Sequence, residues 1–124
     1  MITSKRKLGD LGEEHAVNYL KGLGYRILER NYCRKWGEID IVAKFKKDII
    51  FVEVKSQEKG ARFFPAQNVN YFKQKRLVRA AKTWLAENKM LDAAWQIDVI
   101  VVEIDENSGL HKIEHLRNAV WASR

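Results

Sequence analysis

The sequence has a single cysteine, a single proline and no long hydrophobic run. Cys33 has no second cysteine with which to form a disulfide or a CxxC metal site, and such cysteine usage is typical of a reducing compartment. A membrane helix needs about 20 consecutive apolar residues, and charged residues interrupt every apolar stretch well before that length. The basic N-terminal residues are not followed by the apolar segment of a secretory signal. We therefore expect a cytoplasmic protein with no membrane partner.

Negative charge is the scarcer sign in this chain. It has 23 lysines and arginines against 16 aspartates and glutamates, a formal net charge of +7. A positive excess attracts polyanions, and nucleic acid is the commonest of these in cells. The alternative is a small basic protein without a nucleic-acid partner. The 124 residues, 46% of them hydrophobic, are enough for one domain with a core, and we expect residues 1–124 to form that domain.

Apolar periodicity and turn residues predict an α/β fold, a mixed sheet flanked by helices in the order α-β-β-β-α-β-β. The predicted segments are a helix over Lys5–Leu23, strands over Tyr25–Tyr32, Gly37–Phe45 and Asp48–Ser56, a helix over Tyr71–Asn88, and strands over Gln96–Ile104 and Leu110–Leu116. The apolar run Val99–Val102 indicates a buried, central strand. Gln57–Asn70 is polar and contains glycine, so we predict a loop long enough to suspect a function.

Charged residues interrupt two of these strands. Strand side chains alternate between faces, so we expect Asp40 to share a face with Glu38 and Val42, opposite Ile39 and Ile41. Such charges beside apolar runs are costly to desolvate. Glu38 fits either a role beside Asp40 or a pair with a surface lysine.

The next strand carries Glu53 and Lys55 on one face. Because only Lys46 and Lys47 connect the two strands, we expect an antiparallel hairpin that brings Asp40 towards both residues. Two adjacent carboxylates repel each other, and Mg²⁺ or Mn²⁺ between them would remove the repulsion. Lys55 would then hold an attacking water or stabilise charge on a phosphate. The alternative is an ordinary cross-strand ion pair on a solvated face.

The motif GEIDIV at Gly37–Val42, followed by FVEVK at Phe51–Lys55, resembles the YraN family of uncharacterised bacterial proteins. The resemblance extends over nearly the whole chain, through Gly12-Glu13, Gly24-Tyr25, Arg30-Asn31, Lys73 and Asp98-Val99. That family is assigned to the restriction-endonuclease-like superfamily with the PD-(D/E)xK motif, and it is similar to archaeal Holliday junction resolvases. Ile39 stands where the superfamily motif has proline, and Gln57 where the family often has a basic residue.

The resemblance implies a restriction-endonuclease-like fold and a metal-dependent endonuclease that hydrolyses DNA phosphodiester bonds, with branched DNA as the favoured substrate. It implies Asp40 and Glu53 as ligands of Mg²⁺ or Mn²⁺, Lys55 as the catalytic lysine and Glu13 as an additional acidic residue. A homodimer is implied by analogy with resolvases. The alternative function is a non-catalytic nucleic-acid-binding or protein-interaction module on the same fold. For Glu13 the alternative is a capping box with Asp10 at the N-cap.

Basic residues of the second helix are candidates for phosphate contacts. Lys73 borders the apolar face and would reach the scissile phosphate, or would simply extend its ammonium to solvent. Lys75, Arg79 and Lys82 form a stripe that predicts salt-dependent nucleic-acid binding, with a solvated helix face as the alternative. Gln67, in the preceding loop, is a weaker candidate of the same kind.

Overall fold

The computed structural model describes residues 4–60 and 70–120 and shows the predicted element order. The elements are α1 (Ser4–Gly22), β1 (Arg26–Arg34), β2 (Gly37–Phe45), β3 (Asp48–Glu58), α3 (Tyr71–Glu87), β4 (Trp95–Ile104) and β5 (His111–Leu116). The strands form one sheet in the order β1-β2-β3-β4-β5, in which β3 and β4 are parallel and the other neighbours antiparallel. The predicted α/β fold with a mixed sheet is confirmed.

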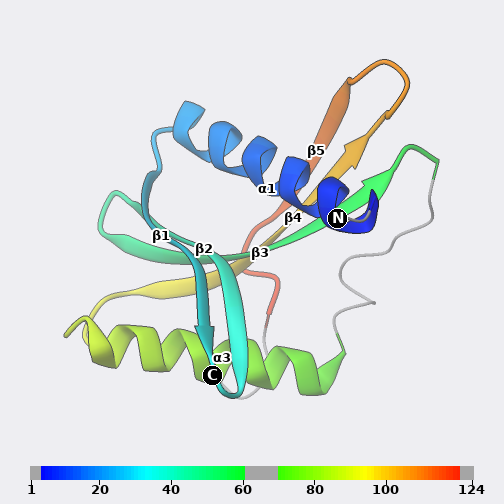
Figure 1. Cartoon of the computed structure of the whole chain (residues 1–124). Coiled ribbons are helices and arrows are strands. Elements are labelled where there is room, and N and C mark those ends of the chain that lie inside the picture. Colours follow the sequence, from blue (N-terminus) through cyan, green and yellow to red (C-terminus); the bar gives the residue numbers. More distant parts are fainter. Residues whose placement is uncertain (1–3, 61–69, 121–124) are drawn as a thin grey trace.

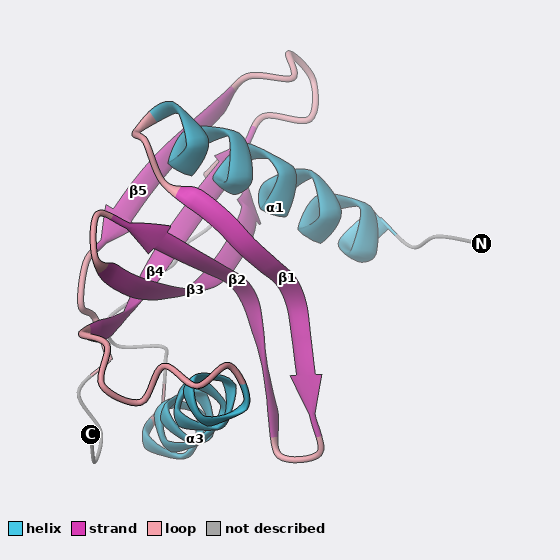
Figure 2. Ribbon diagram, turned by 90° about the vertical axis from the view of Figure 1, so that its left-hand side faces the viewer, coloured by secondary structure: helices cyan, strands magenta, loops and turns pink. Residues whose placement is uncertain are grey.

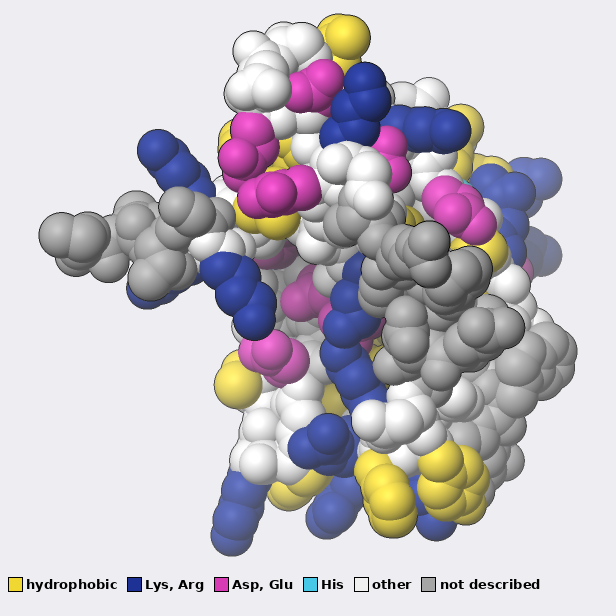
Figure 3. Space-filling view, turned by 90° about the vertical axis from the view of Figure 1, so that its right-hand side faces the viewer, with side chains coloured by type: hydrophobic (Ala, Val, Ile, Leu, Met, Phe, Trp, Pro, Cys, Tyr) yellow, Lys and Arg dark blue, Asp and Glu magenta, His cyan; other side chains and the backbone are white. Residues whose placement is uncertain are grey.

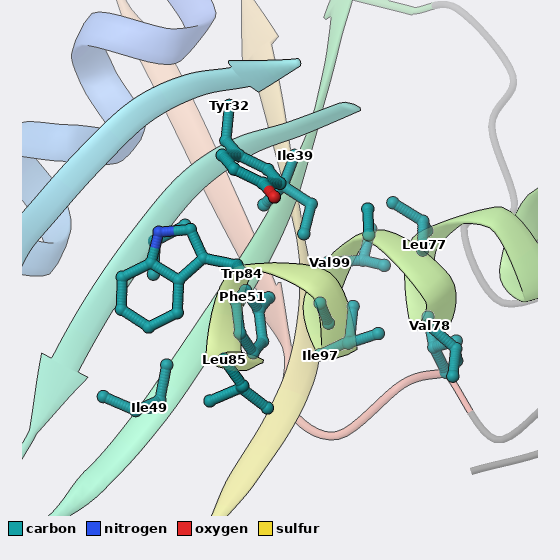
Figure 4. Close-up of a cluster of buried hydrophobic side chains, with 14 of the residues drawn as sticks. Tyr32, Ile39, Ile49, Phe51, Leu77, Val78, Trp84, Leu85, Ile97 and Val99 are labelled. Atoms are coloured by element: carbon teal, nitrogen blue, oxygen red, sulfur yellow. The ribbon is translucent and has the colours of Figure 1, made fainter. Parts of the chain in front are cut away.

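The two helices cover opposite faces of the sheet (Figures 1 and 2). The apolar face of α1, with Ala16 and Leu20, packs on one sheet face. The apolar face of α3, with Leu77, Trp84 and Leu85, packs on the other, as Figure 4 shows. Both helices therefore bury the stripes that their 3.6-residue periodicity predicts.

The centre of the sheet is the parallel pair β3 and β4. Parallel neighbours need a crossover connection, and α3 lies in the connection between them. The predicted central run Val99–Val102 is buried throughout, with side chains in both core clusters. A strand that is apolar on both faces is expected where helices cover the sheet on both sides.

Strands β2 and β3 separate part-way along their length. Their pairing runs from Phe45↔Asp48 to Ile41↔Val52, whereas β2 stays paired with β1 as far as Gly37. Beyond Ile41 the β1–β2 ribbon bends away from β3, and in Figure 2 its turn lies beside α3. We call the point of separation the fork; residues Asp40 and Glu53 are the first on each strand beyond it.

Side-chain alternation in β2 fails at the fork. Ile39 packs with Val42 in the core beneath α3, and Ile41 packs in the core beneath α1. The expectation that Ile39 and Ile41 share a face, opposite Val42, is therefore wrong. Asn31, which lies between the β1 partners of Ile41 and Ile39, has a left-handed backbone with φ of 53°. Asparagine tolerates this conformation, and it marks the bend of the ribbon.

Element ends differ from the prediction in ways that affect the site. Helix α1 already begins at Ser4, so Asp10 lies inside the helix and the capping-box interpretation of Glu13 is wrong. Strand β3 continues to Glu58, into the predicted loop, because Gln57 and Glu58 pair with β4. Within residues 4–60 and 70–120, neither helix has the length and apolar character that crossing a membrane requires.

Candidate active site

The carboxylate of Asp40 fills the fork. Its Oδ2 accepts a hydrogen bond of 2.7 Å from the backbone N–H of Val54, which lies beyond the last β2–β3 backbone pair. A backbone donor that loses its strand partner must find another acceptor when it is buried. Asp40 supplies this acceptor, and the hydrogen bond holds its carboxylate between the two strands.

Glu53 brings a second carboxylate to the same point. It follows Phe51 and Val52 on the central strand β3, and its side chain is only 11% exposed. It lies within hydrogen-bonding reach of Asp40. Burial and the neighbouring Glu53 carboxylate raise the pKa of Asp40 to about 7, while the Val54 N–H and Lys73 oppose the rise. Two carboxylates this close resist simultaneous ionisation, so they share a proton or attract a cation.

Two lysines border the carboxylates. The Lys73 ammonium, from the first turn of α3, lies 3.6 Å from Oε2 of Glu53. Burial and the neighbouring Lys73 ammonium lower the pKa of Lys55, and the carboxylates of Glu53 and Asp40 oppose this. The sequence-predicted set Asp40, Glu53 and Lys55 is therefore brought together, and Lys73 joins it from the opposite side of the fork.

Glu13 approaches the site from α1. Burial raises its pKa, and the Asp40 carboxylate contributes to the rise. Arg30 of β1 opposes it through a contact of 3.3 Å to Glu13 Oε1, and also binds Glu14 at 2.8 Å. The side chain of Glu13 is 14% exposed against 57% for Glu14. Glu13 thus faces the sheet, as its helical spacing predicts, and Arg30 orients it.

Two hollows give access to the fork. One, of about 290 Å³, lies beside α1 and is lined by Asp40, Lys55, Glu13 and neighbouring residues. The other, of about 210 Å³, lies beside α3 and is lined by Glu38, Glu53, Lys73, Arg76, Gly37 and Leu77. In Figure 3 acidic side chains lie in a recessed part of the molecular surface, and lysine and arginine side chains lie next to them. The site is thus open on the α1 side and on the α3 side of the sheet.

The acidic pair suits a hydrated divalent cation. Mg²⁺ retains several waters and is often bound by only one or two carboxylates, and Asp40 and Glu53 provide that number. The Glu53 carboxylate raises the pKa of Asp40 because the two negative charges repel each other, and such a cation would relieve this repulsion. In the described part of the chain, no three Asp, Glu, His or Cys side chains form a closed cage. The donor set therefore fits Mg²⁺ or Mn²⁺ and does not resemble a structural zinc site.

The basic stripe of α3 lies away from the carboxylates. Lys75, Arg79 and Lys82 line a separate, shallow hollow of about 520 Å³, whose lining includes none of the acidic site residues. The Arg79 guanidinium stacks over the Trp36 ring at 4.2 Å. Any phosphates bound there would be at a distance from the fork. Gln67 lies outside the described residues.

Sequence reasoning assigned no role to two arginines near the site. Arg30 binds Glu13, and the contact joins residues 17 positions apart on different elements. Arg76 shares a hollow with Glu53 and Lys73, and its spacing of three residues from Lys73 is the signal that would have found it. Glu38, also in that hollow, is exposed.

The chain is similar in sequence to a known protein family. Residues 12–102 match the model of the uncharacterised protein family UPF0102. A UPF0102 protein of Geotalea daltonii is 45% identical over 114 residues, which cover 92% of this chain and 89% of the relative. One of Alkaliphilus oremlandii is 41% identical, with 92% and 97% covered, and one of Clostridioides difficile is 40% identical, with 94% and 98% covered.

Among solved structures, the chain is similar to Pyrococcus furiosus SfsA in complex with Ca²⁺. The TM-score is 0.36 and the sequence identity 17%. The match covers 91% of this chain and 61% of the SfsA chain.

Proposed function

The chain belongs to the uncharacterised protein family UPF0102, the YraN-like proteins that its sequence resembles, and on this premise we propose that it is a metal-dependent endonuclease acting on DNA. The observation that carries the proposal is that the fold places the carboxylates of Asp40 and Glu53 next to each other at the fork. Two neighbouring carboxylates, with Glu53 buried and the pKa of Asp40 raised to about 7, lower the stability of the fold. Such strongly perturbed groups cluster at functional sites.

The chain's own residues divide the work of phosphodiester hydrolysis. Asp40 and Glu53 would hold Mg²⁺ or Mn²⁺, and Glu13 would accept a hydrogen bond from a water near them. Lys55 would donate to the attacking water or to a phosphate oxygen, with its partial desolvation strengthening that contact. Lys73, which faces Glu53 at 3.6 Å, would be released towards the phosphate once a cation neutralises the carboxylate.

The metal, when bound, would polarise the phosphodiester and lower the pKa of a bound water. The net reaction adds the oxygen of water to phosphorus and breaks one P–O ester bond, and the departing oxygen takes a proton. The positive charge of the chain supports DNA as the substrate class. A branched DNA structure remains the favoured substrate by the resemblance to resolvases.

Cleavage assays test the proposal directly. Branched, flap and single-stranded DNA would be incubated with Mn²⁺ or Mg²⁺ and the wild type, Asp40→Asn or Glu53→Gln. We expect cleavage by the wild type and a loss of at least about 100-fold in each variant, since both remove a charge from the cation site. Asp92→Ala, an exposed acid on the loop before β4, is the matched control and should cleave normally.

Calorimetry with Mg²⁺ or Mn²⁺ alone separates binding from catalysis. The wild type and Asp92→Ala should bind a divalent ion, and Asp40→Asn and Glu53→Gln should not. A protein that binds no divalent ion and cleaves none of the DNA structures, while still binding DNA, would be a binding module, and the enzyme proposal would be wrong.

A further inference from the structure

Two consecutive aromatic side chains stand exposed at the start of α3. Tyr71 is 55% exposed and Phe72 75%, and their rings meet edge to face at 6.0 Å between centroids. The other large hydrophobic residues exposed in the described part are leucines far apart in the sequence, at Leu11, Leu23, Leu91 and Leu110. In Figure 3 hydrophobic side chains gather at this end of α3, below the row of basic side chains.

The aromatic pair is fixed relative to the carboxylates. Asn70 caps the helix by accepting the Lys73 N–H at 2.9 Å, so the first turn that carries Tyr71 and Phe72 is anchored. The next residue, Lys73, reaches Glu53 at 3.6 Å. The rings therefore belong to the same helical turn as a side chain already inside the site.

Phe72 lies on the same face of α3 as a residue that lines the hollow of Glu53. Phe72 and Arg76 lie one turn apart on α3 and therefore share a face, and Arg76 lines the hollow that also contains Glu53 and Lys73. Lys75 lies over the Tyr71 ring at 5.1 Å. Aromatic rings interleaved with cations are how proteins bind unpaired strands, with bases stacked on the rings and phosphates next to lysine and arginine.

We propose that Phe72, supported by Tyr71, is a stacking platform for an unpaired nucleobase close to the phosphodiester at the fork. The preferred substrate would then contain unpaired nucleotides, such as a flap, a loop or a single-stranded end. Bases inside a continuous duplex are stacked on one another and present only their edges in the grooves, so Phe72 would add nothing to duplex binding. The inference rests on the proposed function in taking DNA as the ligand and the fork as the place of its phosphodiester.

Binding measurements without divalent metal test the platform independently of cleavage. A fluorescent single-stranded oligonucleotide and a blunt duplex of the same length would be titrated with wild type, Phe72→Ala and Phe72→Trp. We expect Phe72→Ala to weaken single-strand binding roughly 10-fold, the scale of one lost base–aromatic stack, and to leave duplex binding unchanged. Phe72→Trp should retain single-strand binding because indole also stacks.

Leu110→Ala is the matched control, since Leu110 is 71% exposed but remote in sequence from the site; it should bind both DNAs like wild type. A 2-aminopurine placed in the single strand should be quenched by wild type and less so by Phe72→Ala. Equal loss on single strand and duplex, no loss on either, or a change in oligomeric state alone would overturn the platform. Selective single-strand loss without any metal-dependent cleavage would uphold it while refuting the endonuclease.

Discussion

Gly12 of α1 and Ser56 of β3 approach so closely that no side chain fits between them. A Cβ on Gly12 would lie 1.7 Å from Ser56 Oγ and 2.8 Å from Ser56 Cβ. Gly12 directly precedes Glu13, and Ser56 directly follows Lys55, so this contact sets the distance between α1 and the fork. This glycine thus lets α1 lie close enough to β3 to bring Glu13 to the site.

Gly12→Ala should push α1 away from β3 although alanine favours helices. We expect a loss of about 1–3 kcal/mol in the free energy of unfolding, because overpacking exceeds the gain in helix propensity. Gly9→Ala is the control, since nothing lies within 4 Å of its added Cβ, and it should be neutral or stabilising. Urea denaturation measures both. The double variant Gly12→Ala/Ser56→Gly should recover most of the loss, and failure to recover would contradict the steric account.

A second prediction concerns the buried pair Asp98 and His115. Nε2 of His115 lies 2.7 Å from Asp98 Oδ2, and Nδ1 lies 2.9 Å from the Tyr19 hydroxyl. Asp98 is fully buried and also accepts from Gln96 and the Asn118 backbone. His115→Ala leaves this carboxyl without a main partner and should cost roughly 3–5 kcal/mol.

The corresponding denaturation experiment compares His115→Ala with His111→Ala. His111 is an exposed strand residue stacked on His15 at 3.8 Å, and its loss should cost well under half as much. If the two variants were equally stable, His115 would not be the group that keeps the Asp98 carboxyl satisfied. The buried network is structural in this account, so His115→Ala that still folds should bind divalent ions like wild type.

Much of the fold follows from local sequence pattern. The buried faces of α1 and α3 follow from 3.6-residue periodicity, and the buried, interior position of β4 follows from the run Val99–Val102. The approach of Asp40 to Glu53 was also predictable, because a two-residue connection fixes the register of the β2–β3 hairpin. These features depend on neighbours close in sequence.

Features that depend on distant segments were not predictable. The fork breaks the alternation of β2 at Ile39–Ile41, and the left-handed backbone of Asn31 lies opposite this point on another strand. Arg30 of β1 contacts Glu13 of α1. The position of this helix relative to this strand is set by tertiary packing, which local sequence pattern does not give. The prediction that side chains alternate between faces assumes a regular strand. It fails at the site because β2 is irregular there.

The basic stripe of α3 yields a prediction about salt dependence. If Lys75 and Lys82 contact phosphates, replacing both by glutamine should lower the slope of log affinity against log salt by roughly 1.4 to 1.8, since each phosphate contact contributes about 0.7 to 0.9. Single-stranded and duplex DNA would be titrated across a range of salt concentrations. The matched control is Lys44→Gln/Lys47→Gln, which changes one lysine near the C-terminal end of β2 and one in the turn after it. An equal fall in both double variants would mean that net charge, not the stripe, determines binding.

The last prediction concerns pH and the acidic pair in the absence of divalent ions. The pKa of Asp40 is about 7 in the folded protein against an ordinary value of 3.8, raised by burial and by Glu53. The folded state therefore binds more protons than the unfolded chain between these values, and stability must fall as pH rises through that interval. Each pKa unit corresponds to about 1.4 kcal/mol. Because solvent screens a side chain that is not fully buried, we expect a loss on the order of 2 kcal/mol between pH 4 and pH 8.

Asp40→Asn isolates this contribution because its amide does not titrate. Relative to the variant, wild type should lose stability from pH 4 to pH 8 in urea denaturation with EDTA, and Asp92→Asn should behave like wild type. Adding Mg²⁺ at pH 8 should restore the wild type and leave Asp40→Asn unchanged, because a cation favours the ionised pair and binds only the folded state. Parallel pH profiles for wild type and Asp40→Asn would show that the carboxylates do not repel each other, and the reason for expecting a cation at the fork would disappear.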